Sequence, residues 1–88
     1  MMVINMDNQK GCKSKSNYLI KDNRGILYLQ SYAEIVCIKK DGIVYAKEGG
    51  FDRSKSTNKY MNLFIDRYGG ADYEIMADED FVDMESKL

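Results

Sequence analysis

The sequence predicts an α+β fold: a small antiparallel sheet of three to five strands, with one main helix at about residues 55–68 packed on one face. Two observations support this prediction. Residues 17–47 are short β-rich segments separated by turn-forming residues. From Ser54 onward the apolar residues follow a helical period instead of a strand period. A chain of 88 residues is expected to form one domain, because two halves would each be too small to bury a core.

The N-terminal part differs in composition from the remainder. Residues 1–16 end in "NQKGCKSKS", a mixture of Lys, Ser, Gly and Asn without a period, and are predicted to be a flexible arm. The single α+β domain is therefore placed at residues 17–88.

The predicted strands lie in the next thirty residues. The segments "NYLIK" and "GILYLQS" are separated by the turn "DNRG", and "AEIVCIKK" and "IVYAKE" are joined by Asp41–Gly42, a pair that favours a tight hairpin. In "AEIVCIKK" both faces are apolar: Ala33, Ile35 and Cys37 on one, Val36 and Ile38 on the other. This pattern predicts a central strand covered on both sides, or one that pairs with a partner sheet.

The main helix follows a break at "GGFDRS". At about 100° per residue, one face is apolar and is expected to pack on the sheet; it comprises Thr57, Tyr60, Met61, Phe64, Ile65 and Tyr68. Ser54 is the predicted N-cap and Gly69–Gly70 the predicted end of the helix. The opposite side contains Ser56, Lys59, Leu63 and Arg67.

The C-terminal residues 71–88 form an acidic segment. Residues 1–70 carry twelve Lys and Arg against seven Asp and Glu, a net charge of +5, whereas residues 71–88 carry one Lys against seven acids, a net charge of -6. "DYEIMA" is a candidate for one more strand. "DEDFVDMESKL" has apolar residues at helical spacing behind an acidic first turn, which predicts a short acidic helix.

The residue types that catalysis needs are missing. The chain contains no His, the commonest general base and metal ligand, and it contains no phosphate-binding or dinucleotide-binding motif. We therefore expect a protein that is not an enzyme and that uses no cofactor and no metal ion. The two cysteines, Cys12 and Cys37, are expected to be reduced, and the absence of an apolar run long enough to span a membrane predicts a cytoplasmic protein without membrane contact.

Two groups of residues are candidates for partner binding. The first is the acidic cluster around a phenylalanine, which could occupy a channel built for phosphates and consists of Asp78, Glu79, Asp80, Phe81, Asp83 and Glu85. The second is the outer strip of the main helix, where Leu63 is flanked by Lys59 and Arg67, with Asn62 beside it. For both groups a simpler interpretation is a solvated surface, and the acidic cluster is the better candidate.

Part of the chain resembles a group of short, mostly uncharacterised proteins of bacterial phages and mobile elements. Their pattern is Ser-Tyr-x-x-x-Val, a hairpin, then Ser-x-Thr-Thr-x-Lys-His-x-Asn-x-Phe. The resemblance covers 34 residues, 31–64, with Ser56 in place of the first Thr and Tyr60 in place of the His. The matching positions are Ser31, Tyr32, Val36, Ser54, Thr57, Lys59, Asn62 and Phe64. The resemblance implies a strand–hairpin–helix core and little about activity.

In its small size, its acidic C-terminus and its phage-like relatives, the protein is similar in character to anti-CRISPR inhibitors. The leading hypothesis is a non-catalytic inhibitor from a phage or mobile element that binds a bacterial defence complex of the CRISPR-Cas type and mimics nucleic acid with its acidic segment. The alternatives are a small nucleic-acid-binding accessory protein, which would use a basic face, and a structural homodimer. That basic face would consist of Lys10, Lys13, Lys15, Lys39, Lys40, Lys47, Arg53, Lys55 and Lys59, with tyrosines among them for stacking on bases.

Overall fold

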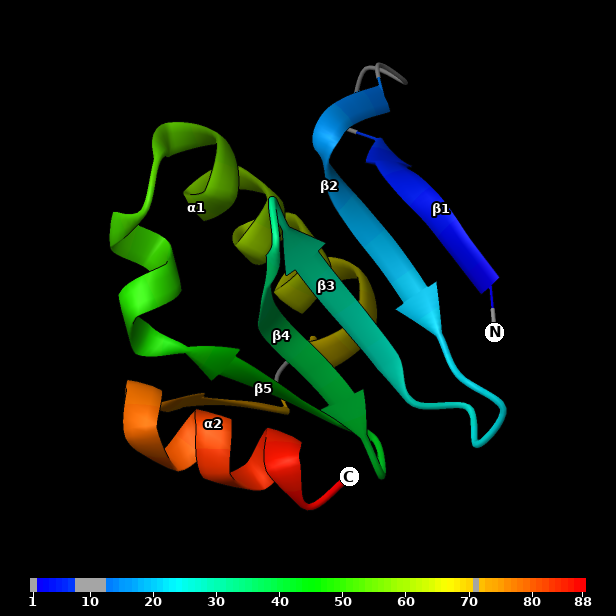
Figure 1. The fold of residues 1–88 in the computed structure, drawn as a ribbon, viewed down its shortest axis with the longest axis vertical. Helices are drawn as coiled ribbons and strands as arrows, with labels where there is room; N and C mark the ends of the chain where they lie inside the picture. Colours follow the sequence, from blue (N-terminus) through cyan, green and yellow to red (C-terminus); the bar gives the residue numbers. More distant parts are fainter. Residues whose placement is uncertain (1, 8–12, 71) are drawn as a thin grey trace.

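Six strands form one sheet in the order β1-β2-β3-β4-β5-β6 in the computed structural model (Figure 1). The structure describes residues 2–7, 13–70 and 72–88, with side chains from Asn17 onward. All neighbouring strands are antiparallel except β5 and β6, which are parallel. The strands are β1 (Met2–Asp7), β2 (Lys13–Lys21), β3 (Leu27–Ser31), β4 (Glu34–Lys40), β5 (Ile43–Lys47) and β6 (Tyr73–Met76).

Two α-helices cover opposite faces of the sheet. After β5 the chain forms a 3-10 helix (Glu48–Asp52), then α1 (Lys55–Phe64), which continues into a π-helical turn (Ile65–Gly69). The second helix, α2 (Asp78–Ser86), follows β6 directly. In Figure 1, α1 lies behind the sheet and α2 lies on the near side. The α+β class, the main helix and the short C-terminal helix are therefore confirmed.

The structure differs from the predicted strand count and from the predicted arm. The sheet has six strands because residues 2–7 and 13–16, predicted as part of an irregular arm, form β1 and the beginning of β2, which pair with each other. The Lys, Ser and Gly content of this segment concealed the adjacent β-branched residues Val3 and Ile4, which favour strands. Residues 1 and 8–12 of the predicted arm, Cys12 included, lie outside the described residues.

The turns and caps follow the predicted residues. Asp41 and Gly42 both have positive φ angles, 54° and 80°, as a tight two-residue hairpin requires. The Ser54 hydroxyl accepts a hydrogen bond from the Thr57 amide and caps α1. Gly70, with φ at 56°, ends the helical region, and its amide donates to the Ile65 carbonyl. These short-range predictions are confirmed because each depends on two or three adjacent residues.

The central strand β4 is covered on both faces, as predicted, but its residues divide between the faces differently. A bulge opposite Leu29 and Gln30 lets two consecutive residues, Val36 and Cys37, join the core beneath α1. Ile35 and Ile38 face α2 instead. The assumed strict alternation therefore failed at one irregular position of the strand.

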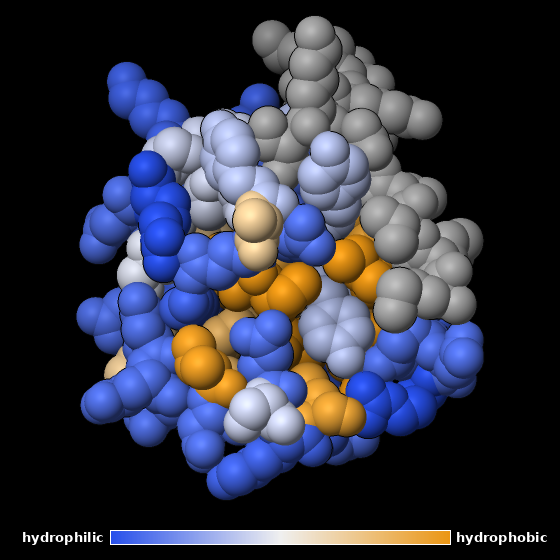
Figure 2. All heavy atoms as spheres, in the orientation of Figure 1, coloured by the Kyte–Doolittle hydropathy of each residue, from blue (hydrophilic) through white to orange (hydrophobic). Residues whose placement is uncertain are grey.

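The core beneath α1 is the larger of the two. It joins Leu29, Val36 and Val44 of the sheet to Met61 and Phe64 of the helix, all of them fully buried. The core beneath α2 is centred on Ile38 and Phe81. Because α2 covers only part of its face, hydrophobic atoms reach the surface beside it over β3 and β4, within a hydrophilic rim (Figure 2).

Candidate partner-binding surfaces

The acidic cluster lies on α2, which one aromatic side chain holds against the sheet. Phe81 is completely buried and packs with Ile38 and Ile26, while Met84 and Leu88 contribute partly buried contacts. The three acids of the first turn of α2 suit the positive end of the helix dipole. The prediction that Phe81 anchors a partner is therefore wrong, because this side chain is already used to fasten α2 to the protein itself.

The acids of this segment do not form a single surface. Asp78 accepts a hydrogen bond from the Gly49 amide at 2.7 Å, and Glu85 is half-buried. Glu79, Asp80 and Asp83 are exposed. We call these three residues the acidic face of α2. Asp83 also pairs with Lys87 one turn later at 2.9 Å, an exposed contact that contributes little to stability.

The predicted strip on α1 lacks the apolar centre that made it a candidate. Leu63 is only 8% exposed and belongs to the core beneath α1, together with Leu19 of β2. Its prediction as an exposed contact residue is wrong. The sheet extends through β2 beneath this side of α1, so Leu63 is buried as well as the predicted apolar face.

The polar members of the strip are exposed. The Lys59 ammonium lies 5.7 Å from the centre of the Tyr60 ring, and the Asn62 amide donates to the backbone carbonyl and the side-chain oxygen of Asn58, both at 2.9 Å. Arg67 is exposed on the π-helical turn. The helix therefore presents separate polar groups rather than a single binding centre.

Residues that carry the phage-protein resemblance meet between the β3–β4 turn and the start of α1. The Ser31 and Thr57 hydroxyls are 2.7 Å apart, and the Ser54 hydroxyl donates to that of Thr57 at 3.0 Å. Tyr32, at the turn, has a φ of 57° and is exposed. This hydroxyl network joins the turn to the helix cap, which gives the motif a structural role.

A cavity of about 290 Å³ lies beside this network, lined in part by Glu34 and Arg53. Glu34 forms ion pairs with Arg53 at 2.8 Å and with the buried Lys47. Glu34 is the carboxylate among the described residues that line the cavity, and it pairs with both cations.

A groove that sequence reasoning missed lies along β6, on the α1 side of the sheet. It has a volume of about 360 Å³. Its lining residues are Phe51, Asn62, Ile65, Asp66, Gly70, Tyr73 and Ile75. The alternation of Tyr73 and Ile75 with Glu74 and Met76 was visible in the sequence, but the place of this strand at the edge of the sheet was not.

The remaining chemical groups of interest among the described residues are the Cys37 thiol and the acidic side chains. Cys37 is fully buried, and burial raises the pKa of its thiol, which keeps it protonated and unreactive. Among the residues whose side chains the structure describes, 17–70 and 72–88, no group of three or more acidic or cysteine side chains is placed to hold a metal ion. Within the same residues, no helix is both long and apolar enough to cross a membrane.

Comparison with known proteins identifies a family for this chain. A family model described as a family of unknown function (DUF8033) matches residues 1–83, a range that includes all six strands, α1 and most of α2. No curated protein and no solved structure matches the chain. Because the match extends over nearly the whole chain, this protein belongs to the DUF8033 family.

Proposed function

We propose that this protein acts by binding another protein through the acidic face of α2, without catalysis, as an inhibitor of a bacterial defence nuclease complex of the CRISPR-Cas type. In this proposal the carboxylates of Glu79, Asp80 and Asp83 bind lysine and arginine side chains of the nuclease complex. These side chains otherwise bind the phosphates of nucleic acid. The protein would come from a phage or mobile element and act in the cytoplasm of the host bacterium.

The burial of Phe81 is the observation that carries this proposal. An acidic tail without a fixed structure would lose conformational entropy each time it bound. Here α2 is already folded and fastened to the sheet by a fully buried ring. The three carboxylates therefore have a fixed spacing along one helix before a partner arrives, as a mimic of regularly spaced phosphates needs.

The alternative of nucleic-acid binding has less support. Several of the cations that would form a basic face are engaged within the protein. Lys47 is buried against Glu34, Arg53 pairs with the same carboxylate, and the Lys39 ammonium lies 5.8 Å from the centre of the Tyr68 ring. Cations with internal partners contribute less to phosphate binding, which depends on charges that are available to replace counterions.

Inhibition of DNA cleavage tests the proposal. The triple variant Glu79→Gln, Asp80→Asn, Asp83→Asn removes the acidic face of α2 and retains the side-chain volumes. Each charge-assisted contact that is lost costs about 1.5–3 kcal/mol, so we expect inhibition to weaken by at least a factor of about 100. The measurement is the rate of DNA cleavage by purified, guide-loaded CRISPR nucleases of several types, with increasing amounts of the protein.

A matched control removes three exposed acids elsewhere: Asp41→Asn, Glu48→Gln and Asp52→Asn. This control has the same net charge as the triple variant and should inhibit like the wild type. Equal inhibition by the triple variant and the wild type would contradict the mimicry proposal, as would a wild-type protein that inhibits none of the nucleases. Weakened inhibition by both variants alike would reduce the effect to net charge.

A further inference from the structure

β6 is an edge strand of the sheet formed by the described residues. It pairs with β5 through the register Val44↔Tyr73 to Lys47↔Met76, and no other strand of the described residues pairs with its outer side. The Val44 amide donates to the Asp72 carbonyl. In a parallel ladder alternate residues direct their backbone groups to the same side, so the amides and carbonyls of Tyr73 and Ile75 point outward.

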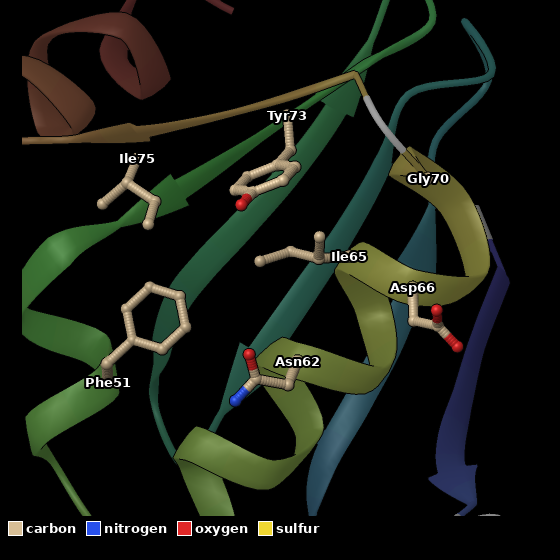
Figure 3. Close-up of a pocket in the computed structure, with 7 residues that line it drawn as sticks. All are labelled: Phe51, Asn62, Ile65, Asp66, Gly70, Tyr73 and Ile75. Carbon is tan, nitrogen blue, oxygen red and sulfur yellow. The ribbon is translucent and has the colours of Figure 1, made fainter.

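The side chains next to this edge are unusually apolar for a surface. Tyr73 is 49% exposed and Ile75 is 50% exposed, and both lie on the α1 side of β6. Figure 3 shows these two side chains and those of Phe51 and Ile65 directed into one groove, whereas the Asp66 carboxylate points away from it. An open strand edge with an apolar groove beside it is what a protein uses to bind an extended peptide as an added strand.

The charge around β6 indicates the chemistry of the occupant. Residues 71–88 carry a net charge of -6, and Glu74 is exposed on the face of β6 opposite the groove. A second copy of this chain, paired through the same edge, would place like charges such as the two Glu74 carboxylates close together, which is destabilising. A basic segment of a different protein has complementary charge.

We propose that the outer edge of β6 binds an extended segment of another protein as a seventh strand. Because successive side chains of a strand point to opposite faces, the segment would alternate apolar residues, which fill the groove, with Lys or Arg, which face Glu74. The four residues of β6 set its length at about four or five residues. This surface is separate from the acidic face of α2, so it can be tested independently of the inhibitor proposal.

A synthetic peptide provides the test. The probe is a fluorescein-labelled seven-residue peptide of alternating Val and Lys with capped ends, and binding is followed by fluorescence anisotropy at physiological salt. Its control has the same sequence with N-methyl groups at alternate residues on the edge that would pair with β6. We expect the probe to bind the wild type and the N-methylated peptide to bind at least about tenfold more weakly, because its amides cannot complete the ladder.

Protein variants locate the binding site. Ile75→Gln should weaken probe binding at least about tenfold, whereas Ile43→Gln, which changes an exposed isoleucine outside the groove, should leave binding unchanged. If Ile75→Gln lowers the melting temperature, Tyr73→Ser serves as the second groove variant. Equal binding by both peptides, or by the Ile75 and Ile43 variants, would overturn the proposal. A wild-type dimer in sedimentation that Ile75→Gln dissociates would also overturn it, since the occupant would be a second copy.

Discussion

At the scale of single residues, Asp22 is a carboxyl group whose pKa is lowered by several hydrogen bonds. It lies in the turn between β2 and β3, and its two oxygens accept hydrogen bonds from the Arg24 and Ile26 amides, the Arg24 guanidinium and the Tyr28 hydroxyl. The Arg24 guanidinium also donates to the Leu88 carbonyl at 2.7 Å, so this turn holds the C-terminal end of the chain. One carboxylate thus organises a turn and a terminus.

These contacts make the stability depend on acid pH. Burial raises the pKa of Asp22, but the hydrogen bonds from Arg24, Ile26 and Tyr28 outweigh it and lower the pKa from 3.8 to about 2. A lowered folded-state pKa means that Asp22 stabilises the fold above about pH 4, and that this contribution is lost as the pH falls towards 2. We expect Asp22→Asn to destabilise the protein at pH 7 and to differ progressively less from the wild type below pH 4.

Urea unfolding followed by circular dichroism between pH 2 and 7 measures this dependence. Asp41→Asn, which changes an exposed carboxyl in the other hairpin, should stay within about 0.5 kcal/mol of the wild type at every pH. A constant difference between Asp22→Asn and the wild type across the whole range would show that the ionisation of Asp22 has no part in stability.

The two incorrectly placed residues, Leu63 and Phe81, show where sequence reasoning reaches its limit. The helical wheel predicted correctly that Phe64 is buried and that Lys59, Asn62 and Arg67 are exposed. It placed Leu63 outside because it assumed that one flat face of α1 meets the sheet, and a helical wheel does not show that Leu19 of the predicted strand "NYLIK" joins Leu63 in the core beneath α1. Phe81 was predicted to be exposed because its neighbours in the sequence are acidic. In the structure it covers the second apolar face of β4 by packing on Ile38.

At the scale of elements, that cover is α2, and its attachment depends on Phe81. Phe81→Ala should lower the free energy of unfolding by about 3–5 kcal/mol, because it removes a fully buried ring and leaves a cavity. Val82→Ala, which changes the neighbouring side chain at 49% exposure, should have an effect within about 0.5 kcal/mol. Chemical denaturation measures both. A Phe81→Ala variant as stable as Val82→Ala would mean that α2 is not fastened through this ring.

The helices, strands and turns were largely predictable from the sequence, whereas the way they pair and pack in space was not. The hairpin at Asp41–Gly42, the cap at Ser54 and the end at Gly70 depend on local conformational preferences that the sequence displays. The parallel pairing of β6 with β5 depends on the path of the chain through α1, which no local pattern records. The groove therefore escaped prediction, since it exists only where Phe51 and Ile65 approach β6.

At the scale of the whole molecule, the charge separation seen in the sequence has a structural counterpart. The segment with a net charge of -6, residues 71–88, contains β6, which lies at one end of the sheet, and α2, which covers the face of the sheet over Ile38 of β4. The opposite end is formed by β1 and β2, whose segment of the sequence is rich in lysine. Both proposed binding surfaces belong to this acidic segment, so each favours a basic partner.

The parallel pairing of β5 with β6 also has a consequence for the order of folding. β2 to β5 are joined by short turns, and their contacts can form locally, whereas β6 reaches β5 only after residues 48–72 have crossed the sheet. Contacts that close long loops form late. We expect the amides of β6 that bond to β5 to exchange with deuterium faster than those of β4, and the Phe81→Ala variant to widen this difference. A partner strand added to β6 would then slow the amide exchange of both β6 and α2. Binding would thus stabilise the elements that are expected to form last.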